Sequence, residues 1–153
     1  MRGSAMYLEN KPLQVFVDTN VLLDVLIQRE DASLSQSSAA FLDYSDDPLL
    51  RMKVSTLSLC TILYVLRKLP KDSLRKKMDR LLKGIEIVGT PKEAYDYVWK
   101  SGYVDLEDAM QTGCAIESGC SLIVTNNVSD YSKSPLQAMT PDDFLKTAYA
   151  DII

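Results

Sequence analysis

Four aspartates occupy positions from which they could act together on a substrate. Asp18 directly follows a short apolar run, Asp105 and Asp108 are three residues apart, and Asp130 follows a second apolar run. Carboxylates that converge on one site are the hard oxygen ligands that Mg²⁺ or Mn²⁺ prefers. Such an ion can generate hydroxide and stabilise the charge that develops on a phosphodiester. The four acids therefore predict a metal site, with Asp18, Asp108 and Asp130 as its catalytic residues.

Histidine is absent from all 153 residues of the chain. This excludes Ser-His-Asp and Cys-His catalysis, histidine-ligated zinc and imidazole acid–base chemistry. The three cysteines, Cys60, Cys114 and Cys120, form no CxxC pair, and we expect them to be small buried hydrophobic residues. Any chemistry must therefore depend mainly on carboxylates.

Each acid also has a purely structural interpretation. Asp105 can cap a helix, Asp108 can favour the first helical turn, and Asp130 can form a turn. Asp18 is the hardest to explain in this way, because aspartate is disfavoured in strands. The metal site therefore depends on whether the fold brings the four acids together.

The elements that must position these acids follow from apolar periodicity and from helix-capping residues. Strands are predicted at 14–18, 51–55, 85–88 and 121–125. Helices are predicted at 19–27, from Asp31 or Ser33 to about 44, and at 56–68, 72–83, 90–100 and 105–117, with a short last helix from Thr140. The expected N-caps include Asp72, Thr90, Asp105 and Thr140.

Alternating strands and helices predict a three-layer α/β/α fold with a central, mostly parallel sheet. The carboxyl ends of parallel strands share one edge, so Asp18 and the segment 125–130 are expected to lie near each other. The length suits a single domain over 1–153, with residues 1–13 as an N-terminal tail. No apolar run is long enough to span a membrane, and we expect a cytoplasmic protein.

Positive charge is concentrated in one part of an otherwise acidic chain. The window 67–83 holds eight of the 17 Lys and Arg residues and only two acids. Such a patch can bind phosphates, or it can be the solvated face of a helix. The candidate RNA-binding residues are Arg67, Lys68, Arg75, Lys76, Lys77 and Arg80.

From 15 to about 145 the chain resembles a PIN domain, the nuclease fold of many bacterial toxin–antitoxin toxins. Five motifs carry the resemblance in order: VDTNVLLD at 17–24, VS at 54–55 leading into LYVLRK at 63–68, DLEDAMQ at 105–111, IVTNNVSDY at 123–131, and MTPDDFL at 139–145. Each motif is weak alone, whereas five at suitable spacing are fairly specific.

The resemblance implies a metal-dependent ribonuclease that uses Mg²⁺ or Mn²⁺. The family's first acid matches Asp18, its helix acid matches Asp108, and its last acidic region matches Asn127 and Asp130. The supporting residues are then Thr19, Asn20, Thr125 and Asn127, with Thr19 orienting the first acid. The implied partners are an RNA substrate, an antitoxin protein and a second copy of the chain, with no membrane.

Two positions depart from the family pattern. Thr61 stands where most active members carry a glutamate, and Asn126 stands where an arginine is usual. These departures keep open a second hypothesis, a degenerate PIN-like module that binds protein or RNA without cleavage. A third hypothesis, a receiver-like signalling domain, ranks lower, because such a domain needs adjacent acids near its start and a lysine after a late strand.

Overall fold

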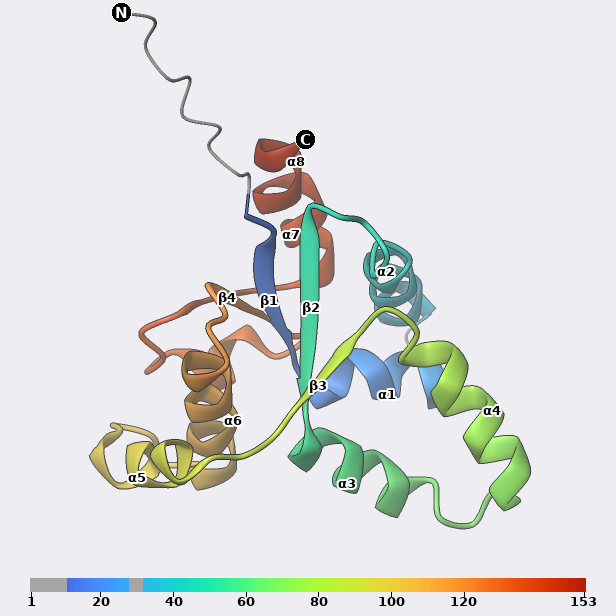
Figure 1. The fold of residues 1–153 in the computed structure, drawn as a ribbon, viewed down its shortest axis with the longest axis horizontal. Helices are drawn as coiled ribbons and strands as arrows, with labels where there is room; N and C mark the ends of the chain where they lie inside the picture. Colours follow the sequence, from blue (N-terminus) through green and yellow to red (C-terminus); the bar gives the residue numbers. More distant parts are fainter. Residues whose placement is uncertain (1–10, 28–31) are drawn as a thin grey trace, which may run out of the picture.

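A computed structural model describes residues 11–27 and 32–153, and it contains one parallel sheet (Figure 1). The strands are β1 (Leu13–Val17), β2 (Leu50–Ser55), β3 (Glu86–Val88), β4 (Leu122–Val124) and β5 (Gln137–Met139). They lie in the order β3-β2-β1-β4-β5, and each neighbouring pair is parallel. The predicted fold class is confirmed, with every strand ending at the same edge.

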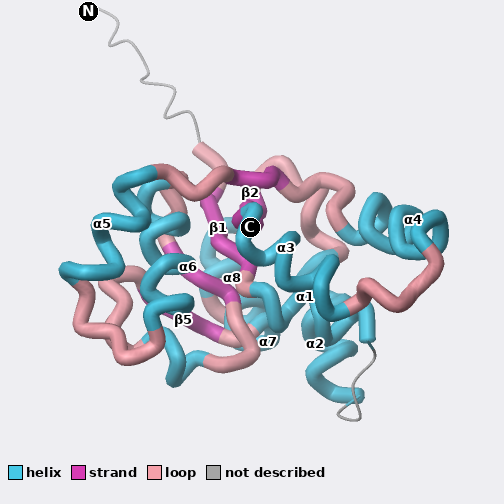
Figure 2. The backbone as a smooth tube through the Cα atoms, turned by 90° about the horizontal axis from the view of Figure 1, so that it is seen from below, coloured by secondary structure: helices cyan, strands magenta, loops and turns pink. Residues whose placement is uncertain are grey.

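Helices cover both faces of this sheet. They are α1 (Thr19–Ile27), α2 (Ala32–Leu42), α3 (Thr56–Val65), α4 (Lys71–Leu81), α5 (Lys92–Lys100), α6 (Leu106–Glu117), α7 (Pro141–Lys146) and α8 (Ala148–Ile152), with a short 3₁₀ helix η1 (Val128–Tyr131). Figure 2, seen from the carboxyl edge of the strands, shows α5 and α6 on one side and α1, α2 and α7 on the other.

The alternation of side chains along the strands divides the core into two layers. Val15 and Val17 of β1 join one buried cluster, which includes residues of α1, α2 and α7. Phe16 joins a second cluster with residues of α5 and α6. The even-numbered residues of β1 therefore face α6. Asp18 continues that even series.

The close crossing of α5 and α6 depends on a glycine. A Cβ atom at Gly113 would lie 2.8 Å from the carbonyl oxygen of Ala94, which is closer than real Cβ atoms approach backbone. The absent side chain lets the two helices form a tight hairpin, whose connection at 101–105 leads into the first turn of α6. Asp105 and Asp108 therefore lie at the tip of this hairpin.

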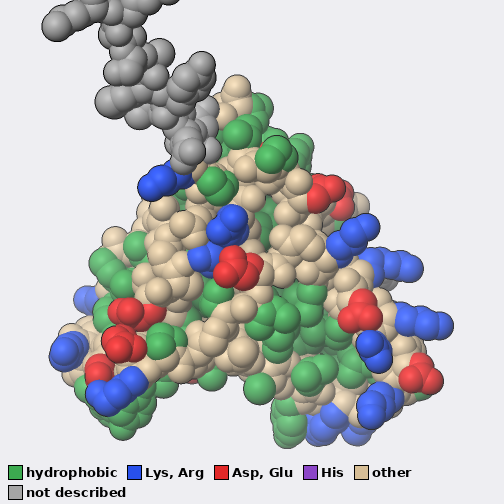
Figure 3. Space-filling view, in the orientation of Figure 1, with side chains coloured by type: hydrophobic (Ala, Val, Ile, Leu, Met, Phe, Trp, Pro, Cys, Tyr) green, Lys and Arg blue, Asp and Glu red, His purple; other side chains and the backbone are tan. Residues whose placement is uncertain are grey.

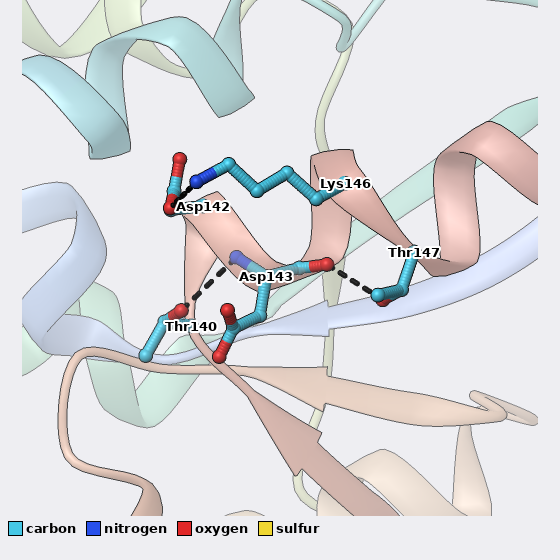
Figure 4. Close-up of polar contacts among 5 residues, drawn as sticks. All are labelled: Thr140, Asp142, Asp143, Lys146 and Thr147. Atoms are coloured by element: carbon cyan, nitrogen blue, oxygen red, sulfur yellow. Dashed lines mark hydrogen bonds and ion pairs between the residues drawn. The ribbon is translucent and has the colours of Figure 1, made fainter.

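Local caps begin the helices near the sheet edge. Asp105 accepts hydrogen bonds from the N–H groups of Glu107 and Asp108, as the capping interpretation predicted. Thr140 accepts from the N–H of Asp143 at 3.1 Å, and Pro141 occupies the first turn of α7 (Figure 4). The capping residues of α6 and α7 were thus readable from sequence.

Other predicted boundaries were wrong by a few residues. Pro70 and Pro91 are the N-cap residues of α4 and α5, so Asp72 lies inside the first turn of α4 and Thr90 lies outside α5. The helix predicted to reach Lys68 ends at Val65. Asp31, one of two proposed starts for the second helix, is outside the described residues.

Several short elements escaped prediction. Strand β5 has three residues, and η1 and α8 have four and five, which is too few for a clear period. Strand β1 starts at Leu13, inside the predicted tail. Cys114 and Cys120 are buried as expected, whereas Cys60 is exposed, so that expectation was wrong for Cys60.

Two helical arms flank the carboxyl edge of the sheet. In Figure 1 the pairs α3–α4 and α5–α6 project below the strand ends on either side, and Figure 3 shows the outline hollowed between them. Among residues 11–27 and 32–153, no helix is long and apolar enough to cross a membrane. The hollow edge is where the carboxylates must be sought.

Candidate active site

Asp18 lies directly after β1, at the centre of the carboxyl edge, and its side chain is 8% exposed. Its carboxylate accepts a hydrogen bond from the N–H of Thr19 at 2.7 Å and one from the hydroxyl of Thr125 at 2.8 Å. Burial is the main reason that the pKa of Asp18 is raised, and the Thr125 hydrogen bond opposes it. The carboxylate is therefore held in a fixed orientation.

All four predicted supporting residues form one network with Asp18, to which Thr19 and Thr125 bond directly. Asn20 donates to the Thr125 hydroxyl oxygen at 3.2 Å, and the N–H of Asn127 donates to the same atom at 3.0 Å. The N–H of Asn126 donates to the side chain of Asn20 at 3.0 Å. Helix α1 and the loop after β4 are thus tied together around the first acid.

Asp108 lies in the first turn of α6, where its side chain is half-buried. Its pKa is raised to about 7, first by burial and then by the negative charges of Asp105, Asp130 and Asp18. Mutual repulsion of this kind requires that the acids lie near one another in space. Asp105 serves as the helix cap, and its position beside Asp108 adds to that repulsion.

Asp130 is exposed in η1, the turn that follows β4. The next residue, Tyr131, is 3% exposed, and its hydroxyl forms no standard hydrogen bond with any described side chain. This hydroxyl nevertheless faces Asp18, since each group affects the pKa of the other. Burial and the charges of Asp18 and Asp108 raise the pKa of Tyr131, and Tyr131 lowers the pKa of Asp18. Tyr131 therefore carries a neutral hydroxyl at the edge of the acidic site.

Carboxylate and amide oxygens fit a hard divalent cation, and a bound cation would relieve the repulsion that raises the pKa of Asp108. The described residues contain no group of three or more His, Cys, Asp or Glu side chains that could already hold a metal ion. Ligation by Asp18, Asp105, Asp108 and Asp130 therefore stays a prediction, and it requires the acids to move closer or to bind partly through water.

A buried polar cluster that sequence reasoning missed lies behind Asp18. It joins Thr19 to Ser55 at the end of β2, Ser58 in α3 and Gln111 in α6. Polar residues in otherwise apolar segments were the available signal. Ser55 ends the run 50–55, and Gln111 interrupts the small and apolar side of α6.

The two departures from the family pattern have separate environments. Thr61 is half-buried on α3, one turn after Ser58, and its hydroxyl donates to the Leu57 carbonyl oxygen at 3.2 Å. Asn126 donates to the buried carboxylate of Asp24 and to Ser38. Asn126 thus ties the loop after β4 to α1 and α2, whereas Thr61 contributes no charge.

The six candidate RNA-binding residues lie in the turn that follows α3 and along α4, and all are exposed. Figure 3 shows blue side chains gathered over α4, at the right of the molecule. Arg67 stacks on the ring of Tyr64 at 4.1 Å, and Arg75 pairs with Asp79 at 3.5 Å. The basic patch is therefore a solvated face on one arm, separate from the acids.

Comparison with known proteins agrees with this fold. Ribonuclease VapC1 of Aquifex aeolicus (strain VF5) is 28% identical over 137 residues, which cover 86% of this chain and 92% of the relative. The crystal structure of VapBC2 from Rickettsia felis, bound to a DNA fragment from their promoter, is similar with a TM-score of 0.65 at 17% identity. It covers 84% of this chain and 98% of that one.

A toxin–antitoxin complex from Klebsiella pneumoniae is similar with a TM-score of 0.61 at 16% identity, covering 83% of this chain and 97% of that one. At such identities these structures support the fold alone. Residues 14–129 match the sequence model of the PIN domain, which covers well over half of the chain and speaks against the receiver-like alternative. This chain therefore belongs to the PIN domain family.

Proposed function

We propose that this protein is a divalent-metal-dependent endoribonuclease that hydrolyses RNA phosphodiester bonds, and that it is the toxin of a toxin–antitoxin pair. One observation carries the enzymatic part: Asp18 is buried at the carboxyl edge of the central strand and is held by Thr19 and Thr125, and its charge is among those that raise the pKa of Asp108. Perturbed carboxylates that share a concave edge are a common property of catalytic sites. The similarity to a relative named Ribonuclease VapC1 supports RNA as the substrate.

The proposed partners follow from the similar proteins. The similar structure from Klebsiella pneumoniae is a toxin–antitoxin complex, and we extend an antitoxin partner to this chain. A homodimer is part of the same proposal. Exposed apolar side chains on α3, such as Leu63 and Tyr64, offer a surface for such contacts.

In the proposed site, Asp18, Asp108 and Asp130 would hold Mg²⁺ or Mn²⁺, with Asp105 and Asn127 nearby. The bound cation would neutralise the acids and act as a Lewis acid toward a phosphodiester. Thr19 and Thr125 keep the Asp18 carboxylate in one orientation through their hydrogen bonds. Tyr131 presents a neutral hydroxyl to Asp18, so it adds no further negative charge there.

The test is a cleavage time course on a mixed RNA substrate with Mn²⁺ or Mg²⁺, repeated with EDTA. The proposal expects cleavage that requires the metal and stops with EDTA. Absence of cleavage at high protein concentration, in either metal, would contradict it.

We expect charge reversal on α4 to weaken RNA binding without changing the chemical step. The test variant combines Arg75→Glu, Lys76→Glu and Arg80→Glu, three exposed residues. Each lost phosphate contact should reduce the slope of log affinity against log salt by about 0.7 for single-stranded RNA. The measurement is RNA affinity at several salt concentrations, together with single-turnover cleavage at saturating protein. An unchanged salt slope would show that α4 does not contact RNA.

A binding module without catalysis is the second candidate, and Thr61 favours it. The residue adds no carboxylate to α3, although it lies one turn after Ser58, which contacts Thr19 beside Asp18. RNA binding with no metal-dependent cleavage would support this candidate over the enzyme.

Thr61→Glu should therefore strengthen cation binding. The added carboxylate at this edge is expected to raise Mn²⁺ affinity about tenfold. This is the scale by which side chains that contact the ligands of a metal change its affinity. Calorimetric titration with Mn²⁺ measures it, with Thr61→Gln as the uncharged control of equal length. Equal affinity in the Glu and Gln variants would place position 61 outside the site.

A further inference from the structure

The buried cluster of Thr19, Ser55, Ser58 and Gln111 lies between Asp18 and Asp108, two of the acids in the proposed active site. We infer that Gln111 is a positioning residue, which fixes the spacing of Asp18 and Asp108 through its hydrogen bond to Thr19. This inference rests on the proposed function for the role of the two acids. It also makes a prediction about the metal-free protein that can be tested alone.

Gln111 is 2% exposed, and Ser55 and Ser58 are fully buried. The amide nitrogen of Gln111 donates to the Ser58 hydroxyl oxygen at 2.9 Å and to the Thr19 hydroxyl oxygen at 3.3 Å. Its amide oxygen accepts from Ser55 at 2.7 Å. Thr19 in turn donates its hydroxyl proton to Ser58 at 2.7 Å. A single side chain of α6 therefore binds the start of α1, the end of β2 and the start of α3.

The pattern of donors and acceptors in this cluster matches an amide. Ser55 donates its hydroxyl proton to Gln111, and Thr19 donates its own to Ser58. The hydroxyl oxygens of Thr19 and Ser58 both accept from the Gln111 amide. An amide has two N–H donors and an accepting oxygen on one planar group, which matches these partners. A carboxylate would lack both donors, and an apolar side chain would leave the Ser55 hydroxyl with only its longer contact to the Ser58 hydroxyl oxygen, at 3.3 Å.

The position of Gln111 links the two acids geometrically. Asp108 and Gln111 are three residues apart on α6, so their side chains lie on the same side of the helix. At the other end of the link, Thr19 donates its N–H to the Asp18 carboxylate at 2.7 Å. The path from one acid to the other therefore has three steps: a helical turn, the Gln111 amide and Thr19.

A general stabilising role and a positioning role make different predictions. Losing any buried hydrogen bond lowers the free energy of unfolding, wherever it lies. Positioning through Thr19 requires in addition that Gln111 and Thr19 act as one unit, so that their effects on the site are not additive. A double-mutant cycle separates these roles.

The experiment measures Mn²⁺ affinity without RNA, and the melting temperature, for Gln111→Met, Thr19→Val and the double variant. Cys114→Ala is the matched control, because Cys114 is buried on the same helix and its thiol contacts Thr90 instead of Thr19. Each single variant should lower Mn²⁺ affinity about tenfold, as for other outer contacts of a metal site. The double variant should lower it no further, and the control should keep the affinity of the unaltered protein. Should Gln111→Met not fold, Ser58→Ala replaces it in the cycle.

Unchanged Mn²⁺ affinity in Gln111→Met, or additive effects in the cycle, would overturn the positioning role and leave the proposed function intact. A protein that binds no Mn²⁺ would instead overturn the metal site. In that case hydrogen exchange of the Thr19 amide in the metal-free protein decides the inference. We expect exchange about tenfold faster in Gln111→Met than in Cys114→Ala; equal exchange in both would overturn the role of Gln111.

Discussion

Asp18→Asn is expected to abolish metal-dependent RNA cleavage, lowering the rate on the order of 100-fold or more, the scale for loss of one electrostatic element of an active site. The substitution keeps the size of the side chain and removes only its charge. Asp18 lies at the centre of the sheet edge and is 8% exposed, so water has little access with which to compensate for the lost carboxylate. Cation binding should weaken with it.

The fold of the variant should survive. The amide oxygen of Asn can still accept from the N–H of Thr19, whereas its amide nitrogen takes the place of the oxygen that accepts from the Thr125 hydroxyl, so that second bond is lost. Since burial raises the pKa of Asp18, removal of the charge also relieves a desolvation cost. The relieved desolvation cost and the lost hydrogen bond oppose each other, so the melting temperature without metal should stay close to that of the unaltered protein.

Asp96→Asn is the control, because Asp96 lies on α5 and pairs only with Lys92 at 2.8 Å in the described contacts. It removes an equal charge far from the sheet edge. Single-turnover cleavage in Mn²⁺ compares the three proteins. Retained cleavage in Asp18→Asn would exclude Asp18 from catalysis, and equal loss in Asp96→Asn would point to a general effect of net charge.

Asp108 should make the metal-free protein less stable as the pH rises. Its pKa in the folded state is about 7, above the ordinary value of 3.8, because of burial and the charges of Asp105, Asp130 and Asp18. The folded state therefore holds this proton more tightly than the unfolded chain. The resulting stabilisation is complete below about pH 4 and is lost as the pH rises to about 7.

Asp108→Asn should remove the part of the pH dependence of stability that Asp108 causes. The variant should melt at a higher temperature than the unaltered protein at pH 8, and the difference should shrink at pH 5. Solvent reaches much of this side chain, so screening reduces the effect. Asp18, whose pKa is also raised, should leave a slope of the same sign in the variant.

Thermal melting at pH 5 and pH 8, with and without Mn²⁺, provides the measurement. Added Mn²⁺ should stabilise the unaltered protein at pH 8 more than at pH 5, since the cation competes with the proton for Asp108. Asp96→Asn should keep the pH dependence of the unaltered protein. Identical melting curves for Asp108→Asn and the unaltered protein at both pH values would show that Asp108 is not perturbed.

The sequence by itself determined the layered fold and the order of its main elements. Alternating apolar runs and helical stripes are local signals, and so are caps such as Asp105 and Thr140, whose partners lie two or three residues away. The motif around Asp18 was likewise readable, because a buried strand that ends in aspartate is unusual. These features need no knowledge of what packs against them.

Only the tertiary structure decided how the acids are held. Gln111 reaches Thr19 across 92 positions of the chain, and Thr125 reaches Asp18 across 107. No local pattern encodes such contacts, because they depend on the crossing of α6 over the sheet and on strand order. The raised pKa of Asp108 has the same origin, since repulsion among carboxylates depends on distance in space and on burial.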